Sequence, residues 1–182
     1  MEKMKVGVVG ANGMVGQRFL TLLADHPYFE VTALVASPRT AGKTYEEALG
    51  GRWKLKAPIP EFAKKMVVID ASKIEEMKPL VDFVFCAVDM KKDEVLALEE
   101  MYAKAEIPVV SNNSANRKTP DVPMVIPEIN DNQLEVIEAQ KKRLGTKRGF
   151  IAVKPNCSIQ SYVPAITPLL KYKPSVILAT TY

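Results

Sequence analysis

Three glycines near the start of this 182-residue chain constrain its fold more than any other feature of the sequence. Gly10, Gly13 and Gly16 recur at every third position, directly after a short apolar run at residues 6–9 and before an amphipathic stretch at residues 15–25. A strand that passes through such a turn into a helix is typical of nucleotide-binding α/β proteins. The first glycine permits the tight turn, the second lets the backbone approach a pyrophosphate, and the third lets the helix pack on the sheet.

The helix after this turn should present free backbone N–H groups and the positive end of its dipole to a bound phosphate. We therefore expect a dinucleotide pyrophosphate to lie against Gly10, Asn12, Gly13, Met14 and Val15. Glycines at this spacing also occur in ordinary tight turns, so the interpretation depends on the order of strand, turn and helix.

The rest of the chain alternates short apolar runs with helical patterns, which is typical of βαβ units and a parallel sheet. Expected strands cover residues 6–9, 31–35, 66–69, 83–88 and 109–110, and expected helices cover residues 15–25, 92–104 and 130–143. In the helix at 92–104, Val95, Leu98 and Met101 should form one apolar face. We predict an α/β fold built on a Rossmann-type, doubly wound parallel sheet.

A domain boundary is expected near Gly145 and Gly149, which flank a basic stretch poor in apolar residues. Residues 1–147 would then form the nucleotide-binding domain, and residues 148–182 would begin a second, α+β domain for substrate binding and dimerisation. That second part should contain a strand at 150–153, a sharp turn, a helix and a final strand at 175–181. Because the chain ends directly after that strand, we expect the fold to be cut off there, with a natural C-terminal edge strand as the alternative.

The end of the second expected strand indicates which dinucleotide binds. NAD-binding folds usually place an acidic residue there, where it bonds the ribose 2′-hydroxyl. This chain has Ser37, Arg39 and Lys43 instead, and no acidic residue before Glu46. Arginine can bind a phosphate through two parallel hydrogen bonds, so this corner favours the 2′-phosphate of NADP. A solvated turn with an incidental arginine is the alternative.

Composition argues against several other classes of protein. Apolar residues make up 47% and charged residues 25% of the chain, which is typical of a globular protein. The net charge of +4 is too small and too dispersed to indicate nucleic-acid binding. The sequence shows no signal peptide, no membrane span and no short metal-ligand spacing. We expect a cytoplasmic protein that binds neither nucleic acid, nor membranes, nor a metal.

The two cysteines differ in their sequence context. Cys86 lies in an apolar strand and is expected to be an inert core residue, although its backbone and that of Ala87 should border the cofactor. Cys157 lies where a helix begins, with Asn156 or Ser158 as the cap. Because a helix N-terminus favours a thiolate, Cys157 is a candidate nucleophile, with a structural cysteine as an equal alternative.

A catalytic cysteine normally needs a histidine as its acid–base partner. His26 is the one histidine of the sequence, and it follows the first helix at the end remote from the glycine turn. We interpret His26 as structural. If Cys157 is catalytic, its base must therefore lie outside these 182 residues.

These landmarks, in this order, resemble aspartate-semialdehyde dehydrogenase, most closely the archaeal and fungal-like branch of that family. The matching segments are residues 10–17, 36–43, 111–117, 122–130 and 155–160, of which the last two are the most specific. The resemblance implies NADPH-dependent reduction of L-aspartyl 4-phosphate to the semialdehyde with release of phosphate, in lysine, methionine and threonine biosynthesis. It also implies a homo-oligomer, since the family is commonly dimeric or tetrameric.

The resemblance assigns roles to particular residues. Cys157 would attack the acyl phosphate and form a thioacyl intermediate, with Asn156 beside it to position the acyl group. Arg117 would bind the substrate phosphate, and Asn112 would lie in a loop near the cofactor and substrate. Ser37 and Arg39, assigned above from charge alone, match the contacts to the 2′-phosphate.

Two departures from the family pattern limit these assignments. Asn12 occupies a position in the turn where the family usually has threonine or serine, which puts one phosphate contact in doubt. The family's glutamine, its substrate-binding glutamate and arginine, and its histidine base would all follow Tyr182 and have no counterpart here. Two alternatives stay open: a related acyl reductase, such as malonyl-CoA reductase or N-acetylglutamyl-phosphate reductase, and a non-catalytic nucleotide-binding module.

Overall fold

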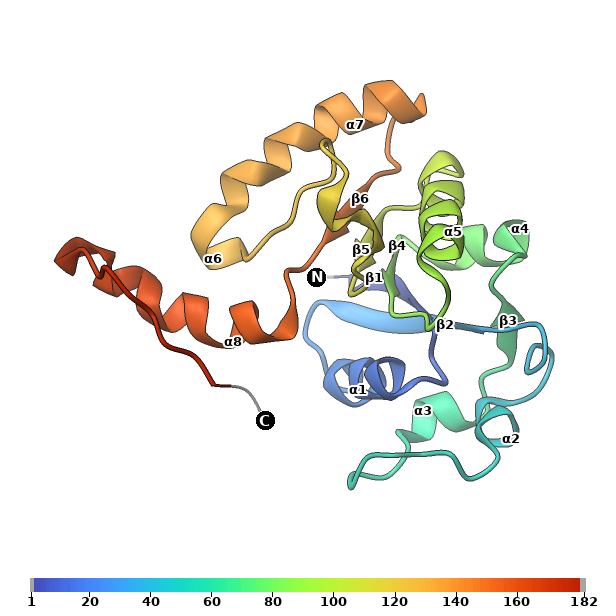
Figure 1. The fold of residues 1–182 in the computed structure, drawn as a ribbon. Helices are drawn as coiled ribbons and strands as arrows, with labels where there is room; N and C mark the ends of the chain where they lie inside the picture. Colours follow the sequence, from blue (N-terminus) through green and yellow to red (C-terminus); the bar gives the residue numbers. More distant parts are fainter. Residues whose placement is uncertain (1, 181–182) are drawn as a thin grey trace.

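A computed structural model describes residues 2–180 of the chain, and its centre is one parallel sheet in the strand order β3-β2-β1-β4-β5-β6 (Figure 1). The strands are β1 (Met4–Val9), β2 (Phe29–Ala36), β3 (Val68–Asp70), β4 (Phe83–Cys86), β5 (Val109–Ser111) and β6 (Ile151–Val153). The order runs outward from β1 to β3 and then, from β4, outward on the other side. This is the doubly wound Rossmann arrangement, and the predicted fold class is confirmed.

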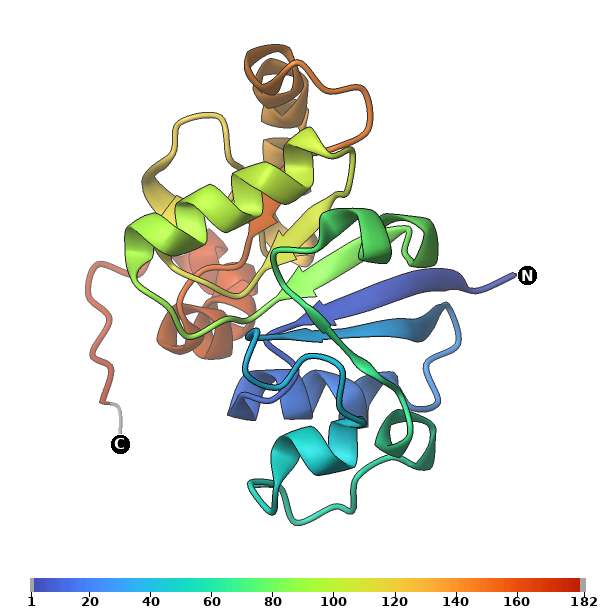
Figure 2. The same ribbon diagram turned by 90° about the vertical axis from the view of Figure 1, so that its right-hand side faces the viewer.

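Helices cover both faces of the sheet, with α4 and α5 on one face and α1 and α2 on the other (Figure 2). The helices are α1 (Met14–Leu23), α2 (Tyr45–Leu49), α3 (Glu61–Lys64), α4 (Ile74–Met77), α5 (Lys92–Lys104), α6 (Pro127–Asn130), α7 (Ile137–Leu144) and α8 (Cys157–Ile166). Four short 3₁₀ helices are η1 (Lys78–Leu80), η2 (Ala115–Lys118), η3 (Asp131–Val136) and η4 (Thr167–Tyr172).

Each face has its own hydrophobic cluster because side chains alternate along a strand. Val9 packs in the cluster that contains Leu98 of α5, whereas its neighbour Val8 packs in the cluster that contains Leu20 of α1. Strands buried on both faces need nearly continuous apolar sequence, which is why the short apolar runs identified these strands.

The helix α5 has the predicted bounds but a different buried face. Val95 and Leu98 are buried as expected, whereas Met101 is 37% exposed and the assignment of Met101 to the buried face is wrong. Glu99 and Tyr102 take that place, because the helix is rotated so that these two residues face the sheet side. The apolar spacing did not predict that this helix buries a carboxylate, that of Glu99, completely.

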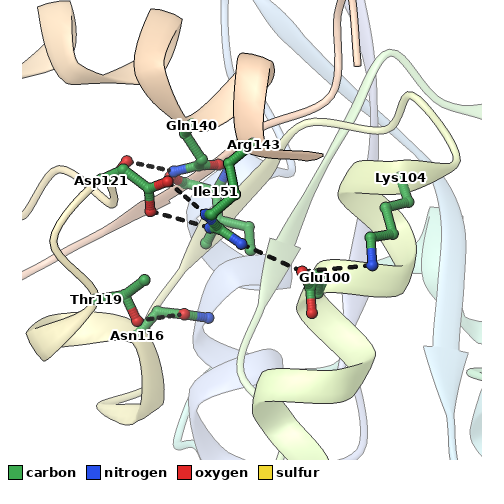
Figure 3. Close-up of polar contacts among 8 residues, drawn as sticks. All are labelled: Glu100, Lys104, Asn116, Thr119, Asp121, Gln140, Arg143 and Ile151. Carbon is green, nitrogen blue, oxygen red and sulfur yellow. Dashed lines mark hydrogen bonds and ion pairs between the residues drawn. The ribbon is translucent and has the colours of Figure 1, made fainter. Parts of the chain in front are cut away.

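The predicted helix at 130–143 is broken into a 3₁₀ segment, η3, and a shorter α-helix, α7. Leu134 is 44% exposed and η3 has no buried residue, so burial contributes little to holding the first half in the predicted register. The helix α7 packs Leu144 into the core and is also held by polar contacts (Figure 3). Arg143 bonds both carboxylate oxygens of Asp121 and reaches Glu100 of α5 at 3.3 Å.

Beyond α7, the sheet continues through β6, which pairs with β5 from Val109↔Ile151 to Ser111↔Val153. The expected boundary between residues 147 and 148 stays a prediction as a division into domains, but the Rossmann sheet itself extends past it. The helix α8 then projects away from the sheet and has no buried residue (Figure 1).

The predicted final strand is absent from residues 175–180, and Thr181 lies outside the described residues. Val176 is 73% and Leu178 is 94% exposed. A strand forms only where a neighbouring strand pairs its backbone, and none lies beside these residues in the part of the chain that the structure describes.

Candidate cofactor and thiol site

The sequence-predicted site residues gather at one edge of the sheet, where the carboxyl ends of the parallel strands meet. Backbone hydrogen bonds continue across this edge: Ala87 N–H donates to the Val9 carbonyl at 2.8 Å, and Asn112 N–H to the Cys86 carbonyl at 2.8 Å. Lys154 N–H donates to the Ser111 carbonyl at 3.0 Å. Open α/β sheets bind their ligands at this edge, next to the point where the strand order reverses.

Two of the three turn glycines are required by the chain's own packing. Gly10 has a φ of +87°, and a Cβ there would lie 2.4 Å from the Ala87 carbonyl oxygen. A Cβ at Gly16 would lie 2.2 Å from the Gly10 carbonyl oxygen and 2.7 Å from the Ala11 Cα. Any side chain at either position would therefore force the backbone to move.

Gly13 is different, because no contact within residues 2–180 requires it to be glycine. It has an ordinary φ of −74°, and a Cβ there would meet no atom nearer than the Gly10 carbonyl oxygen at 3.4 Å. Gly13 is also the N-cap of α1, which has no side-chain cap and no acidic residue in its first turn. Met14 and Val15 are 66% and 41% exposed, and the first N–H groups of α1 have no partner within the helix. An anion can approach this helix end directly.

The corner after β2 lies beside the glycine turn. Ser37 and Arg39 are exposed, and the turn is closed by Thr40 N–H donating to the Ser37 carbonyl at 3.0 Å. The Arg39 guanidinium has no hydrogen-bond acceptor and no carboxylate partner among residues 2–180, so its charge is available to an anionic ligand. The nearest strand-end acid, Asp70 of β3, accepts from the backbone and hydroxyl of Ser72, both at 2.8 Å.

Asn12 joins the turn to this corner. Its Nδ2 donates to the Thr40 hydroxyl at 3.0 Å, and its Oδ1 is buried without a donor among the described residues. Phosphate oxygens are acceptors, as this Oδ1 is, whereas a hydroxyl can donate to it. The side chain as placed would therefore suit a ligand hydroxyl better than a phosphate. The expected phosphate contact from Asn12 therefore remains a prediction and would require the amide to rotate.

Cys86 is completely buried at the end of β4, which confirms that its side chain is a core residue. Burial raises the pKa of its thiol, and the nearby Glu99 carboxylate adds to the rise. Asn113 Nδ2 donates to the sulfur at 3.4 Å. Such a thiol is unreactive, so the contribution of Cys86 and Ala87 to a cofactor site, still a prediction, would come from their backbone.

Arg117 connects the loop after β5 with the segment that leads to Cys157. Its Nε donates to the Lys154 carbonyl at 3.1 Å, and its Nη2 lies 3.4 Å from the carbonyls of Pro155 and of Asn112. These partners are neutral, so the positive charge of Arg117 is not matched by a carboxylate within residues 2–180. The structure thus brings together Asn112, Arg117 and the start of α8.

The start of α8 carries the exposed thiol. Asn156 is its N-cap, and its Oδ1 accepts from Ile159 N–H at 2.9 Å, so the predicted cap is Asn156 and not Ser158. Cys157 is the first residue of the helix and is exposed. Lys154 lies near both Arg117 and Cys157. Burial and then the neighbouring Arg117 lower the pKa of its ammonium, and a negative charge on the Cys157 sulfur would oppose this shift.

His26 lies at the opposite edge of the sheet, just before β2 begins. Its Nδ1 accepts from Tyr28 N–H at 3.2 Å, and its ring stacks on Phe29 at a centroid distance of 4.5 Å. These contacts confirm a structural role at the amino end of the strand. In the described residues, then, no histidine can act on Cys157.

No three His, Cys, Asp or Glu side chains cluster closely enough to hold a metal ion within residues 2–180. No described helix is long and apolar enough to span a membrane.

Comparison with known proteins agrees with this geometry. A family model described as "Semialdehyde dehydrogenase, NAD binding domain" matches residues 5–137, more than half of the chain. The chain belongs to the semialdehyde dehydrogenase family. The predicted resemblance is thereby confirmed, and the glycine turn, the corner after β2 and Arg117 all lie within the matched NAD-binding domain.

Relatives of this family member are known from archaea and fungi. The aspartate-semialdehyde dehydrogenase of Archaeoglobus fulgidus is 42% identical over 167 residues, which cover 91% of this chain and 46% of the relative. That of Saccharomyces cerevisiae is 41% identical over 181 residues, covering 96% and 48%. The chain therefore spans about half the length of the curated relatives it matches.

Solved structures give the same result for the semialdehyde dehydrogenase fold. The crystal structure of aspartate-semialdehyde dehydrogenase with NADP from Candida albicans superimposes with a TM-score of 0.81 at 38% identity, covering 94% of this chain and 48% of that one. An aspartate-semialdehyde dehydrogenase II from Vibrio cholerae, at 22% identity and a TM-score of 0.68, shows the fold alone.

Proposed function

We propose that this chain supplies the NADP-binding part and the nucleophilic thiol of an enzyme that reduces L-aspartyl 4-phosphate to L-aspartate 4-semialdehyde and releases phosphate. The observation that carries the proposal is the contact of Arg117 with the Lys154 and Pro155 carbonyls. Through this contact a guanidinium that has no carboxylate partner among residues 2–180 lies beside the segment that ends in an exposed cysteine at a helix N-terminus. A cation next to a thiol suits a substrate that carries a phosphate on the carbon to be attacked.

The residues present fit NADP. The uncapped start of α1 with the open space at Gly13 would hold the pyrophosphate, and Ser37 and Arg39 would hold the 2′-phosphate. Backbone atoms of Cys86 and Ala87 would border the cofactor at the end of β4. When bound, NADPH supplies the hydride for the reduction.

The chain's own residues would perform the acyl transfer. The Cys157 thiolate attacks the acyl carbon, the bond between that carbon and the phosphate oxygen breaks, and phosphate leaves while a thioester forms on the sulfur. Arg117 binds the phosphate and stabilises the charge that it carries away. Asn156 caps α8 through its Oδ1, which leaves its Nδ2 to bond the acyl oxygen. Asn112, held against Arg117, keeps the loop at the substrate.

The proposal also requires groups that these 182 residues do not provide. His26 is at the wrong edge of the sheet to serve as a base. We therefore propose that the base and the remaining substrate-binding residues come from outside this sequence, and that the 182-residue chain by itself does not turn over. The proposal further includes a homo-oligomer acting in the cytoplasm in amino-acid biosynthesis.

Cofactor choice is tested by titrating the chain with NADPH and NADH, comparing Arg39→Met with the control Arg148→Met. Arg148→Met removes the same charge, but Arg148 lies at the opposite edge of the sheet, before β6 begins, where it bonds Asp82. Loss of charged hydrogen bonds should weaken NADPH binding by roughly 10- to 100-fold in Arg39→Met and leave NADH binding unchanged. Equal binding of both dinucleotides by the wild-type chain would contradict the assignment of NADP.

The chemistry is tested through the first half-reaction, which needs no hydride. The chain is incubated with aspartate kinase, ATP and aspartate, which generate aspartyl phosphate, and acylated cysteine is located by peptide mass spectrometry. We expect an adduct on Cys157 that is absent from Cys157→Ser, and none on the buried Cys86. Acylation by coenzyme A thioesters but not by the acyl phosphate would indicate a related acyl reductase, and no adduct from either would indicate a non-catalytic module.

Turnover is a separate measurement. Phosphate-dependent reduction of NADP⁺ by aspartate semialdehyde should be absent with the 182-residue chain alone. Activity from this polypeptide by itself would refute the need for a base from outside it.

A further inference from the structure

Glu99 is a buried carboxylate without a cationic partner. It lies on α5 with 0% exposure, and no lysine or arginine among residues 2–180 forms an ion pair with it. A charge in such a place is costly unless several donors solvate it. The position of those donors therefore indicates what the residue does.

Three of the donors to Glu99 come from one short segment, residues 111–116, which follows β5, and the buried Cys86 thiol also contacts the carboxylate. Oε1 accepts from the Ser111 hydroxyl and from Asn113 Nδ2 at 3.1 Å, and Oε2 accepts from Asn116 Nδ2 at 2.7 Å. Ser111 Oγ in turn accepts from Asn113 N–H at 3.0 Å, so its own proton is committed to Glu99. One carboxylate thus fixes three positions of the loop.

The loop held in this way carries the arginine of the proposed site. Asn116 immediately precedes Arg117 in η2, and Asn116 Oδ1 accepts from the Thr119 hydroxyl at 3.0 Å (Figure 3). Within η2 itself, Arg117 N–H donates to the Ser114 carbonyl at 3.3 Å, a long bond for holding a single turn in place. The side-chain bonds to Glu99 add to the one other backbone bond at the end of η2, in which Thr119 N–H donates to the Asn116 carbonyl at 3.1 Å.

The neighbours of Glu99 also explain why the residue is a carboxylate. Ser111, Asn113 and Asn116 all present donors, and an ionised carboxylate is the side chain that offers only acceptors. A glutamine would direct its own NH₂ at one of these donors and leave that group unsatisfied.

We propose that Glu99 is a positioning residue that holds Arg117 beside Cys157, so that an anionic acyl group is directed to the thiol. This inference rests on the proposed function, in which Arg117 binds the substrate phosphate. Glu99 makes no hydrogen bond to Cys157 or Arg117 and acts through Asn116.

The test compares two alkylating reagents of similar size, anionic iodoacetate and neutral iodoacetamide, on Cys157 of the intact chain. The ratio of their rates reports the positive charge near the sulfur, whereas a general loosening of the fold raises both rates together. One unscreened charge about 6 Å away in water changes such a ratio by about threefold. We expect Glu99→Gln and Arg117→Gln each to lower the ratio by about threefold, with little change in the iodoacetamide rate.

The matched control is Glu100→Gln, the same change one residue along α5. Glu100 pairs with Lys104 at 3.5 Å and Arg143 at 3.3 Å and does not contact the loop (Figure 3). The ratio of the iodoacetate rate to the iodoacetamide rate in Glu100→Gln should equal that of the wild type. If Glu99→Gln fails to fold by circular dichroism, Asn116→Ala decides, because it deletes the single bond between Glu99 and η2.

Each outcome distinguishes the two proposals. An unchanged ratio in Glu99→Gln or, in its place, Asn116→Ala, together with a lowered ratio in Arg117→Gln, would overturn the positioning role and leave the proposed function standing. An unchanged ratio in Arg117→Gln would remove the anion site of the proposed function, and the role of Glu99 with it.

Discussion

Replacing Gly13 by alanine should weaken binding of NADPH without destabilising the fold, whereas Gly16→Ala should destabilise the fold itself. The two glycines lie in the same turn, but they meet different surroundings. A Cβ at Gly13 would meet the Gly10 carbonyl oxygen at 3.4 Å, which is ordinary contact, whereas a Cβ at Gly16 would meet that same oxygen at 2.2 Å. Gly13 therefore leaves space that the protein does not fill.

The expected magnitudes follow from this difference. Gly13 has φ −74° and ψ 161°, which alanine adopts freely, so Gly13→Ala should stabilise the chain by about 0.4–1 kcal/mol through the unfolded state. For a chain of this size that corresponds to a rise in Tm of about 1–4 °C. Gly16→Ala should cost roughly 1–3 kcal/mol or more because backbone must move. If the Gly13 methyl occupies the approach of the pyrophosphate, NADPH affinity should fall at least about tenfold, or 1.4 kcal/mol.

Thermal denaturation followed by circular dichroism gives the stability of each variant, and titration with NADPH followed by fluorescence gives the affinity. The reasoning is refuted if Gly13→Ala melts as early as Gly16→Ala, because the glycine would then be required by the fold. It is equally refuted if Gly13→Ala binds NADPH as tightly as the wild type.

Two further predictions concern the polar contacts that hold β6 in the sheet. Gln140 Oε1 accepts from Ile151 N–H at 2.6 Å, and its Nε2 donates to the Ile151 carbonyl at 2.9 Å. Gln140→Leu removes both bonds and should lower the free energy of unfolding, measured in urea, by roughly 2–4 kcal/mol. The control Gln133→Leu, at an exposed position, should change it by no more than about 0.5 kcal/mol. Hydrogen bonds from the N–H groups of Lys147, Gly149 and Arg148 lower the pKa of Glu106, so its contribution to stability is present above the unfolded-state pKa and is lost as pH falls through the lower folded value. The loss of unfolding free energy in Glu106→Gln, measured in urea, should therefore be largest at pH 7 and shrink below about pH 4. A loss that grows on acidification would contradict this assignment.

The carboxyl-edge location of the site could be predicted because it depends only on the order of strand, turn and helix. Once β1, β2, β4 and β5 are parallel, the residues after each strand must meet at one edge, whatever the loops between them do. The family resemblance then selected residues such as Arg117 from those loops. Periodicity was a weaker guide for residues 130–143 and 175–181, because an apolar pattern does not reveal whether a partner surface is present.

Glu99 shows why the buried residues behind the site were not predicted from the sequence. It lies four residues after Val95 and three before Tyr102, the helical spacing of a single face, so its position in the buried stripe of α5 could have been read from the sequence. A glutamate in such a stripe is normally assigned to the adjoining solvated face, because burial of a lone carboxylate is costly. The donors from the loop after β5, which make its burial possible, lie 12 to 17 residues further along and are brought to it only by the fold.

The placement of Cys157 follows from the same sheet. Lys154 N–H bonds the Ser111 carbonyl directly after β6, and β6 pairs with β5, so the path from the sheet to the thiol is only four residues long. Arg117, in the loop after β5, also holds this segment through its bonds to the carbonyls of Lys154 and Pro155. The cofactor turn after β1 and the thiol after β6 are therefore held by one continuous set of parallel strands. Wherever the chain divides into domains, the Rossmann sheet sets the position of the start of α8, and a substitution that weakens the pairing of β5 with β6 should displace the thiol before it affects the glycine turn.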